Sequence, residues 1–525
     1  MNVIKNENVK KIKINNILIS TGLLLLLFGL YVFTRNLLLT EDSMIYAVNI
    51  TKGQLSDLFH PHHLLYNPLL KFFIILFVEP KSSIETLNFL QLLNIIITVS
   101  SVEVLYLILW NLKNNFTISI LGSLFYGLSY GPWRYSSQIE VYGLSTLLML
   151  ILLLIVVKTG LEDLKISGYI FITVIIILIL LSHQLNIFFI FAIILAVLTW
   201  RSWALLGKIK LVAIIGFIPL VIVGVVYFAL NVILFNSSNI IDIWRFATMY
   251  AQTGWWGTFQ IKNFIAIGFG FVQSILSLER FSARHYTFFD VAGLLIFLSI
   301  VLYLVILRFR NINALFKNIL VGRILIIWVF LHSIFIWWWY PSNLEFWIQV
   351  LPAVIILFAL LYSNSVKNKI VSKFFLLGIF FIVFLILWNF PVMLELKNMQ
   401  NEYICSSQKL KEITNDKDLI ITSGFGKQYS YLQYFLNAKV YSLHNIRQSD
   451  SNDFVTNRVL SKLDSVLNTT MSESGSIFVT EELYSLKFPT YRSLENFDKS
   501  VLKAYLSNFQ WQSMTLCNIQ FYRKL

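Results

Sequence analysis

Long apolar runs, separated by short polar stretches, fill most of the chain as far as residue 393. A helix needs about 20 apolar residues to cross a bilayer. Runs of this kind predict about eleven membrane spans, at 16–38, 86–110, 115–131, 139–158, 167–182, 185–200, 211–234, 288–308, 320–338, 345–363 and 372–393. The pattern therefore predicts a polytopic α-helical membrane protein.

The loops between these runs predict the orientation. Basic residues concentrate in cytoplasmic loops, and an N-terminus in the cytoplasm puts the clustered lysines and arginines on the inner side. The basic start is followed by Ile17–Thr34 without a small-residue cleavage pattern, so we expect an uncleaved first helix. If segment 262–278 also crossed, Arg308–Asn318 would face outward, against the charge rule. We therefore expect 262–278 to be re-entrant or to lie in the outer interface.

After Pro391 the sequence becomes polar and changes its period. Strand-like runs such as "DLIITSG" and helix-like runs such as "SYLQYFLN" predict a small extracytoplasmic α/β domain at 395–525. A transmembrane module would occupy 1–394, with a first outer loop at about 40–85 and a large outer loop at about 235–287. Cys405 and Cys517 fall in the C-terminal domain, where both a disulfide and two free thiols remain open.

Composition agrees with a membrane location, since the 525 residues are 57% hydrophobic and only 13% charged. The net charge of +14 could suggest a nucleic-acid partner. Basic residues in short loops between apolar spans instead determine topology, so no nucleic-acid partner is expected. The predicted location is the cell inner or plasma membrane.

Unusual polar residues gather on the predicted outer face. The first outer loop carries the acidic pair Glu41 and Asp42, and the histidines of "FHPHH". Later outer segments add further polar candidates, namely Arg134, Glu140, His183, Arg280, Arg284, Asn343 and Glu345. Together they indicate one outward-facing site.

Simpler interpretations stay open for several of these residues. Arginines at span ends can pair with the headgroups of membrane lipids, and Glu140 can favour a helix N-terminus. His183 can be a hydrogen-bonded residue of a helix hairpin. His60 and His63 have the i, i+3 spacing of some zinc pairs, without a clear third ligand. A partly desolvated carboxylate such as Asp42 or Glu41 is suited to act as a general base.

Three stretches resemble motifs of the GT-C superfamily of membrane glycosyltransferases, which includes protein O-mannosyltransferases, aminoarabinose transferases and oligosaccharyltransferases. They are "FHPHHLLYNPLLK" from Phe59, "SQIEVYGLSTL" from Ser137 and "YPSNLEFWIQVLP" from Tyr340. The resemblance implies a GT-C-like fold and inverting transfer of a monosaccharide from a polyprenyl-phosphate donor to a protein, lipid or glycan acceptor on the extracytoplasmic side.

The resemblance also implies roles for individual residues. Asp42 matches the acid that takes the acceptor proton, with Glu41 as the alternate and Glu140 as a second acid. Residues implied near the donor phosphate are His60, His63, Arg134, Arg280 and Arg284. Residues implied in the substrate pocket are Tyr46, His62, Tyr142, His183, Asn343 and Glu345. Some members of the superfamily require a divalent metal and others do not. The acidic pair is adjacent rather than spaced as Asp-x-Asp, so no cofactor is assigned and a divalent metal stays an open alternative.

Two other classes of function compete with this interpretation. A transporter or lipid flippase would place ionisable residues near the middle of the membrane, often in repeated halves. Here they lie at the outer edge and no repeat is evident. A non-catalytic assembly protein of the cell envelope, with an outer domain that recruits partners, is the third possibility.

Overall fold

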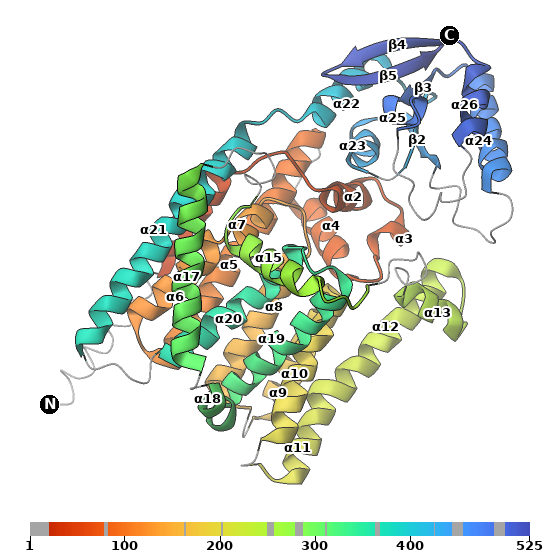
Figure 1. Cartoon of the computed structure of the whole chain (residues 1–525). Helices are drawn as coiled ribbons and strands as arrows, with labels where there is room; N and C mark the ends of the chain where they lie inside the picture. Colours follow the sequence, from red (N-terminus) through yellow and green to blue (C-terminus); the bar gives the residue numbers. More distant parts are fainter. Residues whose placement is uncertain are drawn as a thin grey trace.

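Helices make up nearly all of the first four hundred residues in the computed structural model (Figure 1). The structure describes residues 20–77, 82–161, 164–200, 203–248, 257–278, 287–309, 312–362, 368–424, 426–443, 455–487 and 499–525. Arg280 and Arg284, two of the predicted site residues, lie outside the described residues.

The first outer loop is itself helical, which the apolar pattern did not predict. After a first helix over Ser20–Phe33, the loop forms α2 (Glu41–Thr51), α3 (Leu55–Leu58) and α4 (Tyr66–Phe77). The 12 residues of α4 span about 18 Å, too little to cross a bilayer. Its side chains Phe72, Ile75 and Phe77 are nevertheless exposed and apolar, as expected for a helix lying along a membrane surface.

Each predicted apolar run contains a helix. The helices of the main body are α5 (Ser83–Lys113), α6 (Phe116–Leu128), α7 (Tyr130–Ser136), α8 (Tyr142–Thr159), α9 (Ile166–Ser182), η1 (Gln184–Asn186), α10 (Ile187–Thr199), α11 (Leu205–Val212), η2 (Ala213–Phe217), α12 (Ile218–Phe235), α13 (Ile240–Ala247), α15 (Asn263–Ile275), α17 (Phe288–Phe309), α18 (Ile312–Asn318), α19 (Leu320–Trp339), α20 (Glu345–Tyr362) and α21 (Asn368–Asn398).

In the described part of the chain, five helices are long and apolar enough to cross a membrane. They are Ser83–Lys113, Tyr142–Thr159, Leu205–Phe235, Leu320–Trp339 and Phe375–Ile413, and shorter apolar helices accompany them. Apolar side chains such as Val225, Phe228 and Leu387 project outward from these helices, as lipid-facing residues do. The features are those of an integral membrane protein, while a count of eleven spans stays a prediction.

Helix α15 corresponds to the ambiguous segment 262–278. Its 13 residues extend about 20 Å, which is less than the thickness of a bilayer core. Ile261 and Ile265 at its start are more than four-fifths exposed. This length fits a helix that does not cross, as the charge rule predicts.

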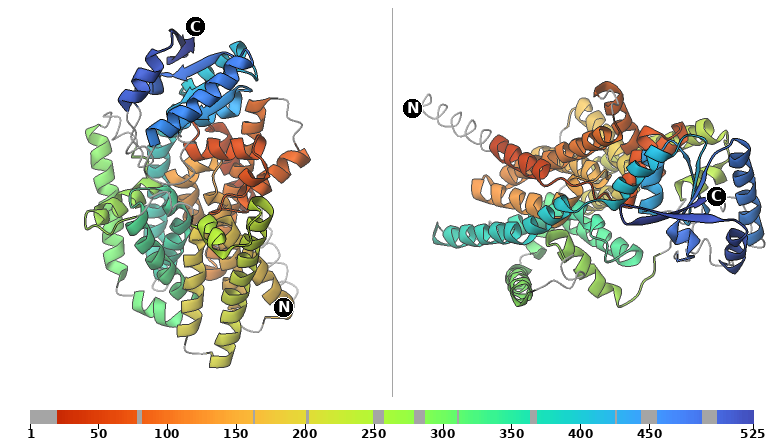
Figure 2. Two further views of the ribbon diagram at one scale, coloured as in Figure 1. Left: turned by 90° about the vertical axis from the view of Figure 1, so that its right-hand side faces the viewer. Right: turned by 90° about the horizontal axis from the view of Figure 1, so that it is seen from above.

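The C-terminal region, residues 395–525, forms three layers at one end of the helical body (Figures 1 and 2). Its elements are α22 (Glu402–Ile413), β1 (Leu419–Thr422), α23 (Lys427–Phe435), β2 (Lys439–Ser442), α24 (Val455–Ser472), β3 (Ile477–Thr480), α25 (Glu481–Tyr484), α26 (Lys499–Ser507), β4 (Trp511–Leu516) and β5 (Ile519–Lys524). The strand order is β2-β1-β3-β5-β4, with β2, β1 and β3 parallel and the other pairs antiparallel.

Both faces of this sheet are covered. Alternate residues Ile421 and Val479 pack with α24 and α26, whereas Ile420 and Phe478 pack with α22 and α23. Continuous apolar strands such as "LIIT" are typical of parallel strands buried on both faces. Independent folding of residues 395–525 as a domain stays a prediction.

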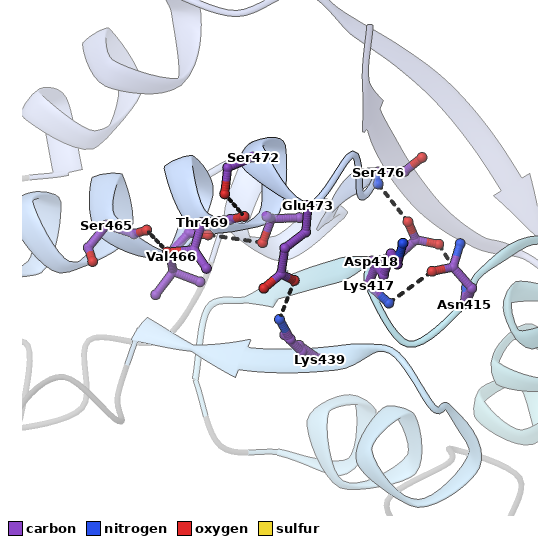
Figure 3. Close-up of polar contacts among 11 residues, drawn as sticks. Asn415, Lys417, Asp418, Lys439, Ser465, Val466, Thr469, Ser472, Glu473 and Ser476 are labelled. Atoms are coloured by element: carbon purple, nitrogen blue, oxygen red, sulfur yellow. Dashed lines mark hydrogen bonds and ion pairs between the residues drawn. The ribbon is translucent and has the colours of Figure 1, made fainter.

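A buried carboxylate joins two of the parallel strands at their amino ends (Figure 3). Asp418 accepts hydrogen bonds from the backbone of Asn415 at 2.8 Å and of Ser476 at 2.5 Å. On the surface nearby, Lys439 and Glu473 form an exposed ion pair at 2.8 Å. The Asp418 bonds fix the start of β1 against the start of β3, whereas exposed ion pairs contribute little stability.

The two cysteines form a disulfide, which settles the alternative that the sequence left open. Cys405 in α22 and Cys517 in the turn between β4 and β5 have Cα atoms 5.9 Å apart. Cys517 and Asn518 both have positive φ, of 49° and 67°. Two such residues in a row match the right-handed twist of a two-residue hairpin. The bond therefore ties α22 to the end of the chain.

Candidate active site

The start of α2 is held by the segment 138–140 just before α8. The Gln138 side chain accepts a hydrogen bond from the Thr40 backbone at 2.8 Å, and the Thr40 hydroxyl donates to Glu140 at 2.6 Å. The Ser43 hydroxyl accepts from the Ile139 backbone at 3.2 Å. Thr40 also caps α2 by accepting from the Ser43 backbone. These bonds bring the first outer loop against the predicted Glu140 motif.

Asp42 lies in the first turn of α2, where the helix dipole favours a carboxylate. Its side chain is exposed, so solvent reaches it, but the surrounding protein still removes much of its hydration. This partial desolvation, followed by the charges of Glu345 and Glu41, raises the pKa of Asp42 to about 7. A carboxylate with a pKa near neutrality can accept a proton during a reaction at physiological pH.

Glu140 differs from Asp42 because it is buried, with 2% of its surface exposed. Burial raises the pKa of Glu140 well above its usual range, and the charges of Glu345 and Asp42 raise it further. Hydrogen bonds from Thr40 and Ser43 oppose this shift. Glu140 therefore favours its neutral form and is better suited to hold the site together than to act as a base.

Glu345 completes a group of three carboxyls that come from three separate elements. It opens α20 and accepts hydrogen bonds from the hydroxyls of Tyr135 at 2.5 Å and Tyr142 at 3.1 Å. The Asn343 amide donates to it at 3.3 Å, while the Asn343 oxygen accepts from the Glu345 backbone at 3.0 Å. The structure thus brings the predicted residues Tyr142, Asn343 and Glu345 together beside Asp42 and Glu140.

The histidines of the first loop form a second group with His183. The rings of His60 and His63 stack at 4.2 Å between centroids, and His63 lies 5.8 Å from His183. Tyr46 meets His63 edge-on at 5.1 Å. His63 is buried, and neither of its ring nitrogens has a hydrogen-bond partner among the described residues. Buried polar atoms usually have a hydrogen-bond partner, and a ligand bound beside His63 could supply one.

Burial keeps this histidine group neutral. It lowers the pKa of His60 to about 3, with a contribution from His62, and it lowers the pKa of His62 to about 4. The pKa of His183 falls to about 3 for the same main reason. At neutral pH these imidazoles can donate hydrogen bonds to a phosphate but do not supply positive charge.

Arg134 binds the segment that precedes α2 rather than Asp42, Glu140 or Glu345. Its guanidinium donates to the Leu38 carbonyl at 2.8 Å and to the Asn36 side chain at 3.3 Å. The basic residue beside the acidic pair is Lys427 of α23, whose charge lowers the pKa of Glu41 against the stronger effect of desolvation. Sequence reasoning missed Lys427, although its position after a strand and a glycine-rich stretch in "LIITSGFGKQ" marks a strand-to-helix turn.

Among the described residues, no group of three or more His, Cys, Asp or Glu side chains has the arrangement of a metal site. His60 and His63 stack face to face without a third ligand of that kind.

An apolar groove of about 310 Å³ lies between α12 and α13. Its lining consists of Leu220, Val223, Gly224, Tyr227, Ile240, Ile243, Trp244 and Ala247. One end of the groove meets the histidine loop, since the Tyr227 hydroxyl donates to the Pro61 carbonyl. The Gln184 amide donates to Pro61, Tyr227 and Ala247 at 2.8–3.1 Å. The groove is therefore continuous with the loop that carries His60, His62 and His63.

No family model and no curated protein matches the sequence. Among solved structures, the chain is similar to ArnT from Cupriavidus metallidurans bound to undecaprenyl phosphate, with a TM-score of 0.62 and 9% identity over 97% of both chains. The apo state of the same ArnT gives a TM-score of 0.58 with 10% identity over 97% of both chains.

A second protein of similar structure, the oligosaccharyltransferase AglB from Archaeoglobus fulgidus, was solved with an inhibitory peptide and a dolichol-phosphate. Its TM-score is 0.54 with 11% identity, over 96% of this chain and 74% of that chain. At these identities the likeness concerns the fold. ArnT and AglB are members of the GT-C superfamily, and the present chain shares their fold over nearly its whole length.

Proposed function

We propose that the chain is an integral-membrane glycosyltransferase that moves a monosaccharide from a polyprenyl-phosphate donor to an acceptor on the extracytoplasmic face. The observation that carries the proposal is Asp42, a first-loop carboxylate with a pKa of about 7 beside Glu140 and Glu345 in a GT-C fold. Fold alone does not define function, so the proposal depends on this site.

In the proposed reaction, Asp42 takes the proton from the acceptor group as that group attacks the anomeric carbon of the sugar. The new bond forms on one face while the bond from the anomeric carbon to the phosphate oxygen breaks on the other. The electron pair leaves with the polyprenyl phosphate, and the anomeric centre inverts. Glu41 is the alternate base, since it precedes Asp42 in the same helical turn.

The other polar residues would hold the substrates. Neutral His60, His62 and His63 would donate hydrogen bonds to the donor phosphate, each through its one protonated ring nitrogen, and both ring nitrogens of His63 are buried. Arg280 and Arg284 remain candidates for the positive charge. Glu345, fixed by Tyr135 and Tyr142, would contact the sugar or the acceptor.

The groove between α12 and α13 offers a place for the first isoprene units of the donor. It is almost wholly apolar and ends at the histidine loop, so a lipid chain in it would leave its phosphate beside His60 and His62. The phosphate would then lie on one side of the sugar, and the carboxyl groups of Asp42, Glu140 and Glu345 on the other.

The proposed orientation has a cytoplasmic N-terminus and an extracytoplasmic C-terminal region. The Cys405–Cys517 disulfide supports it, because disulfides persist in oxidising compartments outside the cytosol. The proposed substrates and partners are the polyprenyl-linked sugar, the acceptor and membrane lipids.

The test is glycosyl transfer by purified protein in nanodiscs, with polyprenyl-phosphate sugars and extracts of envelope acceptors, followed by mass spectrometry. Asp42→Asn is expected to abolish transfer. The matched control is Asp57→Asn, since Asp57 lies in the same loop and only caps α3 through a 2.8 Å bond to the Gln54 backbone. Unchanged transfer by Asp42→Asn and by Glu41→Gln would exclude the proposed base.

A further inference from the structure

The segment 36–40, between the first helix and α2, is bound through its backbone by side chains from several distant elements. From the main body, the Gln91 amide of α5 donates to the Asn36 carbonyl at 2.7 Å and Arg134 of α7 donates to the Leu38 carbonyl at 2.8 Å. Gln138 accepts from the Thr40 backbone at 2.8 Å. This segment leads directly into the helical turn that carries Asp42.

Two further residues of the segment, Leu37 and Leu39, are bound by the C-terminal region. The Tyr431 hydroxyl of α23 accepts from the Leu39 backbone and donates to the Leu37 carbonyl, both at 3.1 Å. Asn401 donates to the same Leu37 carbonyl at 2.7 Å and to the Tyr431 hydroxyl at 2.8 Å. The hydroxyl thus uses its one donor and both acceptor positions, in a site where Tyr431 is 1% exposed.

The other end of α2 also contacts α23. Lys52, the C-cap of α2, donates to the carbonyls of Gln433 at 3.0 Å and Leu436 at 2.6 Å, at the carboxyl end of α23. A lysine there interacts favourably with the helix dipole. Helix α23 therefore holds α2 at both ends, as the adjacent positions of the two helices in Figure 1 also show.

The placement of Asp42 depends on this attachment. Within the described part of the chain, no side chain or backbone group forms a hydrogen bond with the Asp42 carboxylate. Its position is therefore set by the backbone of α2. The contacts of segment 36–40 and of Lys52 hold that backbone at both ends, in addition to the Ser43 bonds and the buried side chains of the helix.

We propose that Tyr431 and Asn401 are positioning residues for Asp42, and that the C-terminal region thereby completes the reacting site from outside the membrane helices. The inference rests on the proposed function. Neither residue needs to touch a substrate, because both act through the backbone at Leu37 and Leu39.

The test compares Tyr431→Phe with Tyr434→Phe. Tyr434 lies on the same helix and donates a hydrogen bond to the Ser83 carbonyl at the start of α5, at 2.9 Å. It forms no hydrogen bond with segment 36–40 among the described residues. Phe at 431 keeps the ring that stacks on Tyr403 at 5.6 Å. We expect Tyr431→Phe to lower kcat roughly 10- to 100-fold with little change in KM, since a small misplacement of a reacting group has effects of this size. Tyr434→Phe should stay near wild type.

A second readout does not depend on catalysis. Carbodiimide labelling of Asp42 at a series of pH values, read by mass spectrometry, reports when this carboxyl is protonated. Tyr431→Phe should move the labelling midpoint to a lower pH than in wild type, because a less firmly held α2 exposes the Asp42 carboxylate to more water. Tyr434→Phe should leave the midpoint unchanged. Asn401→Asp is the second variant, since it keeps the oxygen that caps α22 and loses both donated bonds.

Failure of the positioning role and failure of the proposed function would give different results. Equal labelling midpoints and equal kcat for Tyr431→Phe and Tyr434→Phe would overturn the positioning role. A shifted midpoint in Tyr431→Phe, in a protein that transfers no sugar even as wild type, would reject the proposed function and retain the structural coupling between Tyr431 and Asp42.

Discussion

The Tyr142 hydroxyl donates a 3.1 Å hydrogen bond to the Glu345 carboxylate, across 203 residues of sequence. Tyr142 opens α8 and Glu345 opens α20, so this bond joins the starts of two apolar helices. Tyr135 donates to the other oxygen of the same carboxylate at 2.5 Å. The pair of tyrosines holds Glu345 toward Asp42, whose pKa responds to its charge.

Replacing either of these tyrosines should lower the kcat/KM of glycosyl transfer. Hydrogen bonds to charged groups contribute about 1.5–3 kcal/mol, which corresponds to roughly 10- to 100-fold in kcat/KM if the bond persists in the transition state. We expect losses in this range for Tyr142→Phe and for Tyr135→Phe. Because both bind one carboxylate, the double variant should lose less than the product of the two single effects. Steady-state kinetics of the three variants measure this, and strictly multiplicative losses would contradict a shared role.

The rate should depend on pH through Asp42. A base must be ionised to accept a proton, and the pKa of Asp42 is raised to about 7, so activity should fall as pH decreases through about 7. The titratable groups near it are Glu345, Glu41 and the mainly neutral Glu140, with Lys427 close to Glu41. Glu345→Gln removes a negative charge, which should move the acidic midpoint of log(kcat/KM) to lower pH. An acidic limb with an ordinary carboxylate midpoint in the wild type would speak against this assignment.

Breaking the disulfide should destabilise the C-terminal region. Cys405 and Cys517 are 112 residues apart, and closing a loop of this length corresponds to about 4–5 kcal/mol in the chain-entropy model. We expect Cys517→Ser to lower the thermal midpoint of detergent-solubilised protein. Wild type in excess reductant should match the variant, and reductant should not change the variant itself. A midpoint that is insensitive to both treatments would be inconsistent with this account.

Filling the groove between α12 and α13 should weaken the binding of the lipid chain of the donor. Gly224 lines the groove, and a Cβ added there meets no atom within 4 Å, so Gly224→Leu should fold while reducing the groove volume. We expect a higher KM for donors with long isoprenoid chains and no change for a short-chain analogue. Gly207→Leu is the matched control, since Gly207 also has open space around it and does not line the groove. Equal effects of both variants on the long-chain donor would place the lipid elsewhere.

Much of this architecture could be predicted because a bilayer imposes a strong pattern. Apolar runs of sufficient length encode helices locally, and each predicted run contains one. The GT-C resemblance, drawn from three short motifs, is confirmed by the likeness of the fold. Two of these motifs contain Glu140 and Glu345, and the acidic loop after the first helix pointed to Asp42. The charges of these three residues influence one another in the structure.

The remaining features depend on partners that no local pattern contains. Arg134 was predicted near the donor phosphate, which stays a prediction, and the sequence does not show that its guanidinium binds Asn36 and Leu38. His60 and His63 were predicted near the donor phosphate, but the sequence does not show that burial lowers the pKa values of the histidines in this loop. Helices α2, α3 and α4 escaped prediction because their stabilising contacts come from packing rather than from a long apolar run. Tyr431 carried no signal at all, since its role arises from a contact across 392 residues.

That last contact has a consequence for how the protein is made. Leu39 leaves the ribosome long before Tyr431, so α2 has to wait for almost the whole chain before its amino end acquires its final partner. A product truncated after α21 would keep its membrane helices and its acidic pair but lack the residues that fix them. Synthesis of α23 would thus act as a quality check, because the proposed base is held in place only after that helix has been made.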